Sequence, residues 1–271
     1  MPIKFLCETL KWQPKIMKYY HSKQNPFGLS AHAYFWEYLQ KEPSKKHLDY
    51  GCNNGRVINE LARSNLIEEG YGLDANQTVI NEHAHQCEPS VELSIIEVGK
   101  SIPFEDSYFS SCSLFGVLEH IHDQSSILDE LNRVLEKDGT FIIAVPGKHF
   151  FSFLDLGNWK FVFPRLHRFL YEALRSKEQY EKKYLNNPFG LIGDIEAKKA
   201  WHQHFTKEEL SQILIEHKFE VIEIDGCGFF WRLIHNFQLL LPKPLKKILE
   251  PLAILDKKIF SQAEIWALCK K

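Results

Sequence analysis

HLDYGCNNGR, residues His47–Arg56, is the stretch of the sequence that decides the fold. A short apolar strand runs into a tight turn with glycines at 51 and 55, and a helical pattern begins near Arg56. At the carboxyl end of a parallel strand, such a turn directs backbone N–H groups and a helix N-terminus toward one point. We therefore expect a binding site there for a ligand that carries carboxylate or ribose oxygens.

A second acidic position supports this interpretation. Asp74 ends the next strand-like run, YGLDAN, at the spacing of about twenty residues that is typical of ribose-binding carboxylates. The glycine turn alone is a weak signal, because ordinary tight turns also use this spacing. Turn and carboxylate together predict a nucleotide-type site.

The composition places the chain among ordinary globular proteins. It has 271 residues, 44% of them hydrophobic and 25% charged, which is enough for a sizeable core. A formal net charge of -2 argues against a general nucleic-acid binder. The six cysteines form no CxxC pair, which favours free thiols in a reducing compartment. The start, MPIKFLCETLKW, does not read as a signal peptide, and we expect a cytoplasmic protein.

Strand and helix patterns alternate along most of the chain. Residues 1–46 read as a helical lead-in, and residues 47–271 read as one domain. Strands are expected near 47–50, 71–74, 94–98, 112–115, 140–145, 219–224 and 264–269. Helices are expected near 56–64, 77–87, 127–135, 206–214 and 243–260. This alternation predicts an α/β fold with a doubly wound, mostly parallel sheet.

Residues 148–204 interrupt this rhythm and are rich in aromatic side chains. They follow the fifth strand, where open α/β sheets add lids over the ligand crevice, so we expect an acceptor lid. The segment carries ten Lys/Arg against six Asp/Glu, and residues 232–271 carry eight against three. A solvated face is the commonest reason for such a bias. The alternative is peripheral contact with an anionic membrane or a lipid-linked acceptor.

Four motifs follow one another in a fixed order: LDYGCNNG, LDAN, IPFEDSYFSSCSLFGVLEHIHD and LDELNRVLEKDGTFIIAVPG. Together they resemble the class I S-adenosylmethionine (SAM)-dependent methyltransferases of the small-molecule type, over roughly residues 45–147 and 204–271. The resemblance implies a seven-stranded Rossmann-like sheet whose final strand is antiparallel and lies beside the sixth. It also implies SAM as cofactor, bound across the carboxyl ends of strands one, two and four.

The resemblance assigns cofactor-binding roles residue by residue. Asp49 would order the glycine turn, Asp74 would hold the ribose, and Asn53 stands where the family has its second glycine. Asn tolerates left-handed backbone better than other non-glycine residues. The acidic residue that often follows the third strand is absent from the sequence at 98–101, so no adenine contact is assigned. The implied cofactor-binding residues are Asp49, Gly51, Cys52, Asn53, Gly55, Asp74, Ala75, Asn76, Phe115 and Leu118.

Histidines are the candidates for the acceptor side of the site. His202 and His204 lie in WHQHF, just before the helical rhythm returns, and His120 follows Glu119 after the fourth strand. A histidine near its ordinary pKa could take a proton from an attacking hydroxyl. Each His-x-His pair lacks a third ligand at a recognisable spacing, so we predict no metal.

These observations favour an enzyme that moves a methyl group from SAM to a small-molecule acceptor, ring-bearing or lipid-linked, with oxygen as the favoured acceptor atom. The sequence after the fourth strand, FGVL, lacks an Asn-Pro-Pro-Tyr type signature, which disfavours a nucleic-acid amine. A nicotinamide dehydrogenase would need glycines at Asn53 and Arg56. The remaining alternative is a binding module or membrane-docked scaffold that has kept the fold and lost catalysis.

Overall fold

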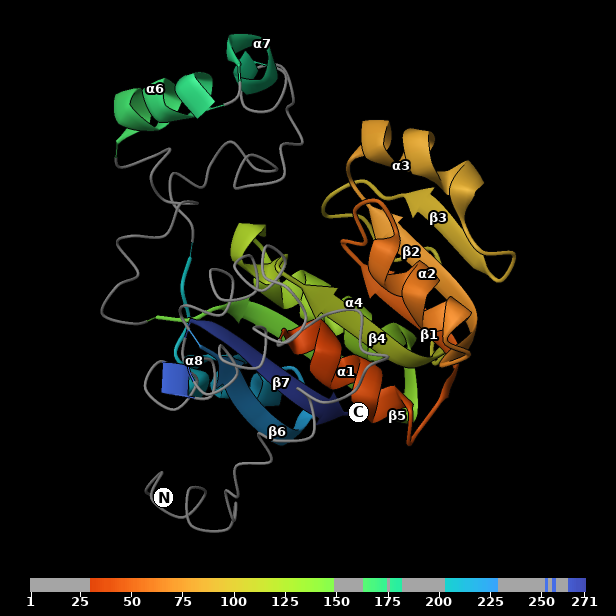
Figure 1. Cartoon of the computed structure of the whole chain (residues 1–271). Helices are drawn as coiled ribbons and strands as arrows, with labels where there is room; N and C mark the ends of the chain where they lie inside the picture. The colour runs from red at the N-terminus through yellow and green to blue at the C-terminus, as the bar shows by residue number, and fades with distance from the viewer. Residues whose placement is uncertain are drawn as a thin grey trace.

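A single mixed sheet of seven strands organises the computed structural model of the chain (Figure 1). The structure describes residues 30–148, 163–174, 176–181, 203–228, 252, 255–256 and 263–271. The strand order is β3-β2-β1-β4-β5-β7-β6, and β7 runs antiparallel to both of its neighbours. The strands are β1 (Ser44–Tyr50), β2 (Ile67–Asp74), β3 (Val91–Ile95), β4 (Phe109–Phe115), β5 (Leu135–Pro146), β6 (Glu220–Cys227) and β7 (Glu264–Lys270). The predicted α/β sheet with an antiparallel last strand beside the sixth is confirmed.

Helices cover both faces of this sheet. On one face, buried side chains such as Phe35 and Ile58 pack α1 and α2 against the strands; on the other, Leu128 and Leu210 do the same for α4 and α8. Burial on both faces explains why β5 is a continuous apolar run from Phe141 to Val145 rather than an alternating one. The helices of the two layers are α1 (Ala31–Leu39), α2 (Arg56–Arg63), α3 (Gln77–His83), α4 (Gln124–Val134) and α8 (Lys207–Glu216), with 3-10 turns η2 (Ala84–Gln86) and η3 (Leu118–His120).

Several predicted boundaries were wrong; β2, for example, begins at Ile67 and not at residue 71. The third strand spans Val91–Ile95 rather than 94–98, because Val91 and Leu93 face the core while Ile95 and Val98 are exposed. The helix expected to reach 135 ends at Val134, and β5 begins at the next residue. An irregularity in the β4–β5 register absorbs the Lys-Asp-Gly stretch that was expected to separate helix from strand.

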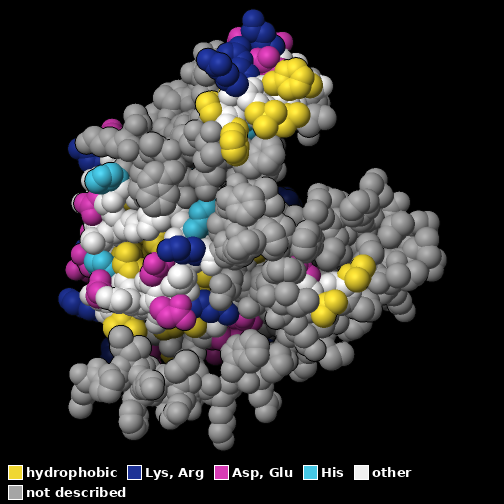
Figure 2. Space-filling model, turned by 90° about the vertical axis from the view of Figure 1, so that its left-hand side faces the viewer, with side chains coloured by type: hydrophobic (Ala, Val, Ile, Leu, Met, Phe, Trp, Pro, Cys, Tyr) yellow, Lys and Arg dark blue, Asp and Glu magenta, His cyan; other side chains and the backbone are white. Residues whose placement is uncertain are grey.

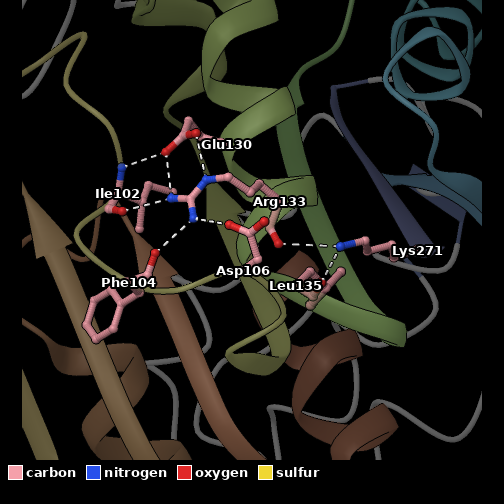
Figure 3. Close-up of polar contacts among 7 residues, drawn as sticks. All are labelled: Ile102, Phe104, Asp106, Glu130, Arg133, Leu135 and Lys271. Carbon is pink, nitrogen blue, oxygen red and sulfur yellow. Dashed lines mark hydrogen bonds and ion pairs between the residues drawn. The ribbon is translucent and has the colours of Figure 1, made fainter.

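A guanidinium fixes the connection between β3 and β4 onto α4 (Figure 3). Arg133 donates to the backbone carbonyls of Ile102 and Phe104 at 2.9 Å each, and it pairs with Glu130 and Asp106 at 2.8 Å each. Glu130 also accepts from the backbone N–H of Ile102 at 2.8 Å. These hydrogen bonds raise the pKa of Arg133 and lower that of Glu130. Both stay charged, and the long loop before β4 keeps one position.

Two short helices lie apart from the layered core (Figure 1). They are α6 (Pro164–Leu174) and α7 (Lys177–Tyr180), which pack together around the buried ring of Tyr180. Three predicted segments lie wholly or mostly outside the described residues: the insert 148–204, the helix 243–260 and residues 1–29 of the lead-in. Among the described helices, none has the length and apolar character needed to cross a membrane.

Candidate cofactor-binding and acceptor site

The turn after β1 has an alternating left-handed backbone. The φ angles of Gly51, Asn53 and Gly55 are 81°, 52° and 70°, so Asn53 takes the conformation expected of it. The backbone N–H groups of Gly51 and Cys52 both donate to the carbonyl of Leu73, at 2.7 and 3.1 Å. The turn is therefore tied to the end of β2, and α2 begins immediately after it.

Asp74 joins the two loops on which the cofactor prediction depends. One carboxylate oxygen accepts from the backbone N–H of Asn53 at 2.8 Å, and the other accepts from that of Asn76 at 2.8 Å. Each carboxylate oxygen can accept more than one hydrogen bond, so both can still receive a ligand hydroxyl. Asn76 in turn caps α3, because its side chain accepts from the backbone N–H of Val79.

Val117, a residue that the sequence did not indicate, packs closely on the turn at Gly51. A Cβ atom on Gly51 would lie 2.2 Å from Cγ2 of Val117, far inside contact distance. On Gly72, it would lie 2.8 Å from the sulfur of Cys52. Both glycines therefore allow neighbouring side chains to reach the backbone. No sequence signal marks Val117, because its contact with Gly51 spans sixty-six positions in the chain.

Asn59 is a second residue that the sequence reasoning missed. Its amide nitrogen donates to the carbonyl of Gly55 at 2.8 Å, and its oxygen accepts from the backbone N–H of Glu88 at 2.7 Å. It is buried on the same side of α2 as Ile58 and Leu61. A polar residue between these apolar ones could have indicated a structural hydrogen bond to the turn.

Asp49 lies at the carboxyl end of β1 and is buried. The Ser113 hydroxyl on β4 donates a hydrogen bond to the Asp49 carboxylate at 2.7 Å. Burial raises the pKa of Asp49 to about 6; the Ser113 hydrogen bond opposes this shift and the charge of Asp74 adds to it. Burial also raises the pKa of the neighbouring Cys52 thiol, which therefore stays protonated.

Two predicted cofactor-binding residues, Phe115 and Leu118, and the predicted acceptor-side residue His120 follow one another at the carboxyl end of β4. Phe115 packs its ring 4.2 Å from that of His32 on α1, whereas the Leu118 side chain is fully buried and supports the turn from the core. His120 is buried in η3, with its Nε2 4.0 Å from a Glu119 carboxylate oxygen.

The segment that carries His204 reaches the same place. Gln124 donates one hydrogen bond to the carbonyl of Leu118 at 2.9 Å and another to the side chain of Gln203 at 3.0 Å. Phe205 donates to the carbonyl of Pro146 at the end of β5. His204 is therefore half-buried at this edge of the sheet, and His202 lies outside the described residues. Among the described residues, no group of three or more His, Cys, Asp or Glu side chains could hold a metal ion.

Comparison with known protein families matches residues 20–224 to the methyltransferase domain family. The chain belongs to this family. The match covers the turn, Asp74 and the strands that carry them, and it includes α1. The resemblance to SAM-dependent methyltransferases is therefore confirmed, and SAM is the cofactor of this fold.

Curated relatives are distant. A provisionally named methyltransferase, 235L of Invertebrate iridescent virus 6, is 22% identical over 245 residues, which cover 89% of this chain and 80% of that protein. Sterol 4-C-methyltransferase strm-1 of Caenorhabditis elegans is 28% identical over 116 residues, 42% of this chain. That match spans 35% of the sterol enzyme. A 37.1 kDa protein of a Streptomyces fradiae transposon is 28% identical over 40% of this chain, and the match spans 32% of the transposon protein.

Solved structures share the fold at low identity. The 1,6-didemethyltoxoflavin-N1-methyltransferase of Burkholderia thailandensis, solved with S-adenosylhomocysteine, has a TM-score of 0.50 and 13% identity. The comparison covers 90% of this chain and 79% of that one.

The residues present fit SAM. The Asp74 carboxylate has hydrogen-bonding capacity left for two ribose hydroxyls, the left-handed turn at Gly51 presents backbone, and Asp49 places a second carboxylate next to it. SAM carries a sulfonium and an ammonium group, so two carboxylates at the carboxyl ends of adjacent strands suit its positive charge. Bound there, SAM would supply an electrophilic methyl group.

Proposed function

We propose that the protein transfers the methyl group of SAM to an oxygen atom of a small-molecule acceptor. The family membership supports methyl transfer, and two of the similar proteins are named for small molecules, a sterol and 1,6-didemethyltoxoflavin. In this reaction the protein's task is alignment and exclusion of water, because the sulfonium is already a strong electrophile.

The acceptor would lie between the Leu118–His120 turn and the segment before α8. One observation carries this part of the proposal: the Gln124 side chain bridges the carbonyl of Leu118 and the side chain of Gln203. Two segments more than eighty residues apart therefore line one edge of the sheet, beside the turn at Gly51 on which Val117 packs.

His204 is the proposed general base. It adjoins Gln203 and Phe205, whose contacts fix this segment, and it is half-buried, so an acceptor could reach its ring. It would receive the proton of an acceptor hydroxyl as the new carbon–oxygen bond forms. His120 is buried in the Leu118–His120 turn, so it would position other groups rather than transfer a proton. A role for His202 stays a prediction from the sequence.

An apolar acceptor is favoured by α6. Leu166 and Phe169 on this helix expose 45% and 68% of their surface, and Phe163, directly before it, exposes 50%. Figure 2 shows hydrophobic side chains gathered at one end of the molecule, beside Lys, Arg, Asp and Glu side chains. An exposed aromatic surface suits a ring-bearing or lipid-linked acceptor. A membrane-docked scaffold would use the same surface without methyl transfer.

The test is a methylation assay with SAM that carries a deuterated methyl group. The purified protein is incubated with a metabolite extract and a lipid extract, and products are identified by mass spectrometry from the mass increment. The Asp74→Ala variant serves as the control with impaired cofactor binding. Labelled product in the wild type and not in the control supports the proposal. SAM binding without any labelled product from either extract would favour the scaffold.

A further inference from the structure

A buried chain of polar side chains leads away from Asp49 into the sheet. The ring of His47 lies between two hydroxyls of β4, with its Nδ1 2.7 Å from the Ser111 hydroxyl and its Nε2 3.1 Å from that of Ser113. Ser113 in turn contacts Asp49 at 2.7 Å. All four residues are buried, and the β1–β4 register pairs them two by two. The Ser111 hydroxyl also lies 2.7 Å from the hydroxyl of Ser44.

These four side chains share few polar hydrogens, and this number restricts the position that each hydrogen can take. An ionised Asp49 only accepts, so Ser113 must give it its single hydrogen and must accept from Nε2 of His47. A neutral ring then has an unprotonated Nδ1, which accepts from Ser111 in place of the hydrogen bond that Ser111 otherwise donates to Ser44. A protonated Asp49 reverses every bond: it donates to Ser113, Ser113 donates to Nε2, and Nδ1 carries the ring hydrogen and donates to Ser111. His47 thus has one tautomer for each protonation state of Asp49.

We propose that His47 is a positioning residue for the cofactor site, which acts on Asp49 through Ser113 and changes tautomer whenever Asp49 changes its protonation state. The proposal rests on the proposed function, because Asp49 belongs to the site for SAM. Burial lowers the pKa of His47 to about 3, so the ring stays neutral at ordinary pH and acts through its tautomer rather than its charge.

Other titratable groups lie around this hydrogen-bonded series of side chains without being members of it. Asp74 at the end of β2 and the Cys52 thiol interact with Asp49 electrostatically. Lys270 on β7 donates to Thr140, which pairs with Ser111 in the sheet register. The helices over this face carry the titratable residues His32, Tyr34, Glu37, Tyr38, Arg56 and Glu60, and the ring of Phe35 packs 5.4 Å from that of His47.

The pH window follows from the raised pKa of Asp49, about 6. Above it the carboxylate is ionised and attracts the positive charge of SAM; below it the attraction is lost. SAM affinity should therefore fall as pH drops below about 6, by up to tenfold per pH unit. Asp49→Asn should abolish this dependence, since its amide does not titrate.

The first test is nitrogen NMR on protein labelled with 15N-histidine, without SAM, from pH 5 to 8. The His47 signals, assigned by their loss in His47→Gln, should report a ring protonated at Nε2 at high pH. They should shift toward the Nδ1-protonated form with the midpoint of Asp49. In Asp49→Asn the ring should keep one tautomer. A His47 tautomer that stays constant while Asp49 titrates overturns the proposal.

The second test is the midpoint of the pH dependence of SAM affinity, measured by calorimetry. Ser113→Ala removes the hydrogen bond to the ionised carboxylate and should move the midpoint upward by about one pH unit. His47→Leu should move it in the same direction by less, and Ser94→Ala on β3, whose hydroxyl contacts Glu92 and not these residues, should leave it in place. Equal midpoints in all three variants contradict the proposal. If the wild type binds no SAM, the proposed function fails, and the NMR result still decides the role of His47.

Discussion

Asp74 is the residue on which the ribose assignment depends. Its two carboxylate oxygens hold the backbone N–H groups of Asn53 and Asn76, so it organises both loops before any ligand arrives. Asp74→Ala should weaken SAM binding by about 1.5–3 kcal/mol, the scale of charge-assisted hydrogen bonds. Calorimetric titration with SAM gives the affinity, and thermal unfolding of the same variant reports how far the loops themselves have loosened. Unchanged affinity would remove Asp74 from the site.

Gly51 offers a sharper test of the turn, since the chain provides a matched glycine. A Cβ on Gly51 would collide with Val117, whereas Gly99 has a similar φ of 78° and nothing within 4 Å. Gly51→Ala should lose SAM affinity by more than tenfold, because Val117 and the turn must move apart. Gly99→Ala should cost only about 1 kcal/mol of stability, for its left-handed backbone, and leave SAM affinity unchanged.

The double variant Gly51→Ala/Val117→Ala removes the clashing methyl group and should recover part of the SAM affinity. Equal SAM affinities in Gly51→Ala and Gly99→Ala would mean that the contact between Gly51 and Val117 does not shape the cofactor site.

At the scale of single elements, α8 and the segment before it define the proposed acceptor side. The helix begins as its sequence predicts: Thr206 and Glu209 form a reciprocal capping box. His204→Ala should lower turnover by about 10²- to 10⁴-fold and leave SAM affinity nearly intact. His217→Ala, at the opposite end of α8, is the matched control and should keep full turnover. Full turnover in His204→Ala would return this histidine to a structural role.

The exposed face of α6 gives the second prediction at this scale. Phe169→Ser should leave the melting temperature unchanged, because 68% of this side chain is exposed in the folded protein. If the acceptor covers this face, the loss of buried apolar area corresponds to about 1.5–3 kcal/mol and appears as a higher KM for an apolar acceptor. Ile215→Ser on α8, a residue 52% exposed, is the control. Equal KM values in the two variants would separate α6 from the acceptor.

Elements whose signals are local could be predicted from the sequence, and contacts between distant strands could not. Asp49, Gly51 and Asp74 lie in two short motifs, and the fold places both at adjacent strand ends. The hydrogen-bond partners of these residues could not be predicted in the same way. Ser113 reaches Asp49 only because β1 and β4 pair in one particular register, and nothing in the sequence fixes that register by itself. The third strand was misplaced since its exposed apolar residues imitate buried ones.

At the scale of the whole molecule, the sheet brings together the proposed site from segments spread over more than 150 positions. The strand order puts β1 between β2 and β4, so the turn after β1 receives contacts from both. Arg133 ties the long connection between β3 and β4 to α4, with hydrogen bonds to two backbone carbonyls and two carboxylates.

Replacement of Arg133 should therefore destabilise the fold rather than the cofactor site. Arg133→Met keeps the aliphatic stem and removes every guanidinium contact, which should lower the free energy of unfolding by about 2–4 kcal/mol. Arg133→Lys keeps a point charge near Glu130 but not the planar fork, and should fall between wild type and Arg133→Met. Arg63→Met is the control: the Arg63 side chain is 54% exposed and pairs with Glu60 and Glu88, so its loss should cost clearly less than the loss of Arg133. Denaturant unfolding gives these values, and a cost for Arg133→Met no larger than that for Arg63→Met would show that the loop before β4 holds its place without the guanidinium.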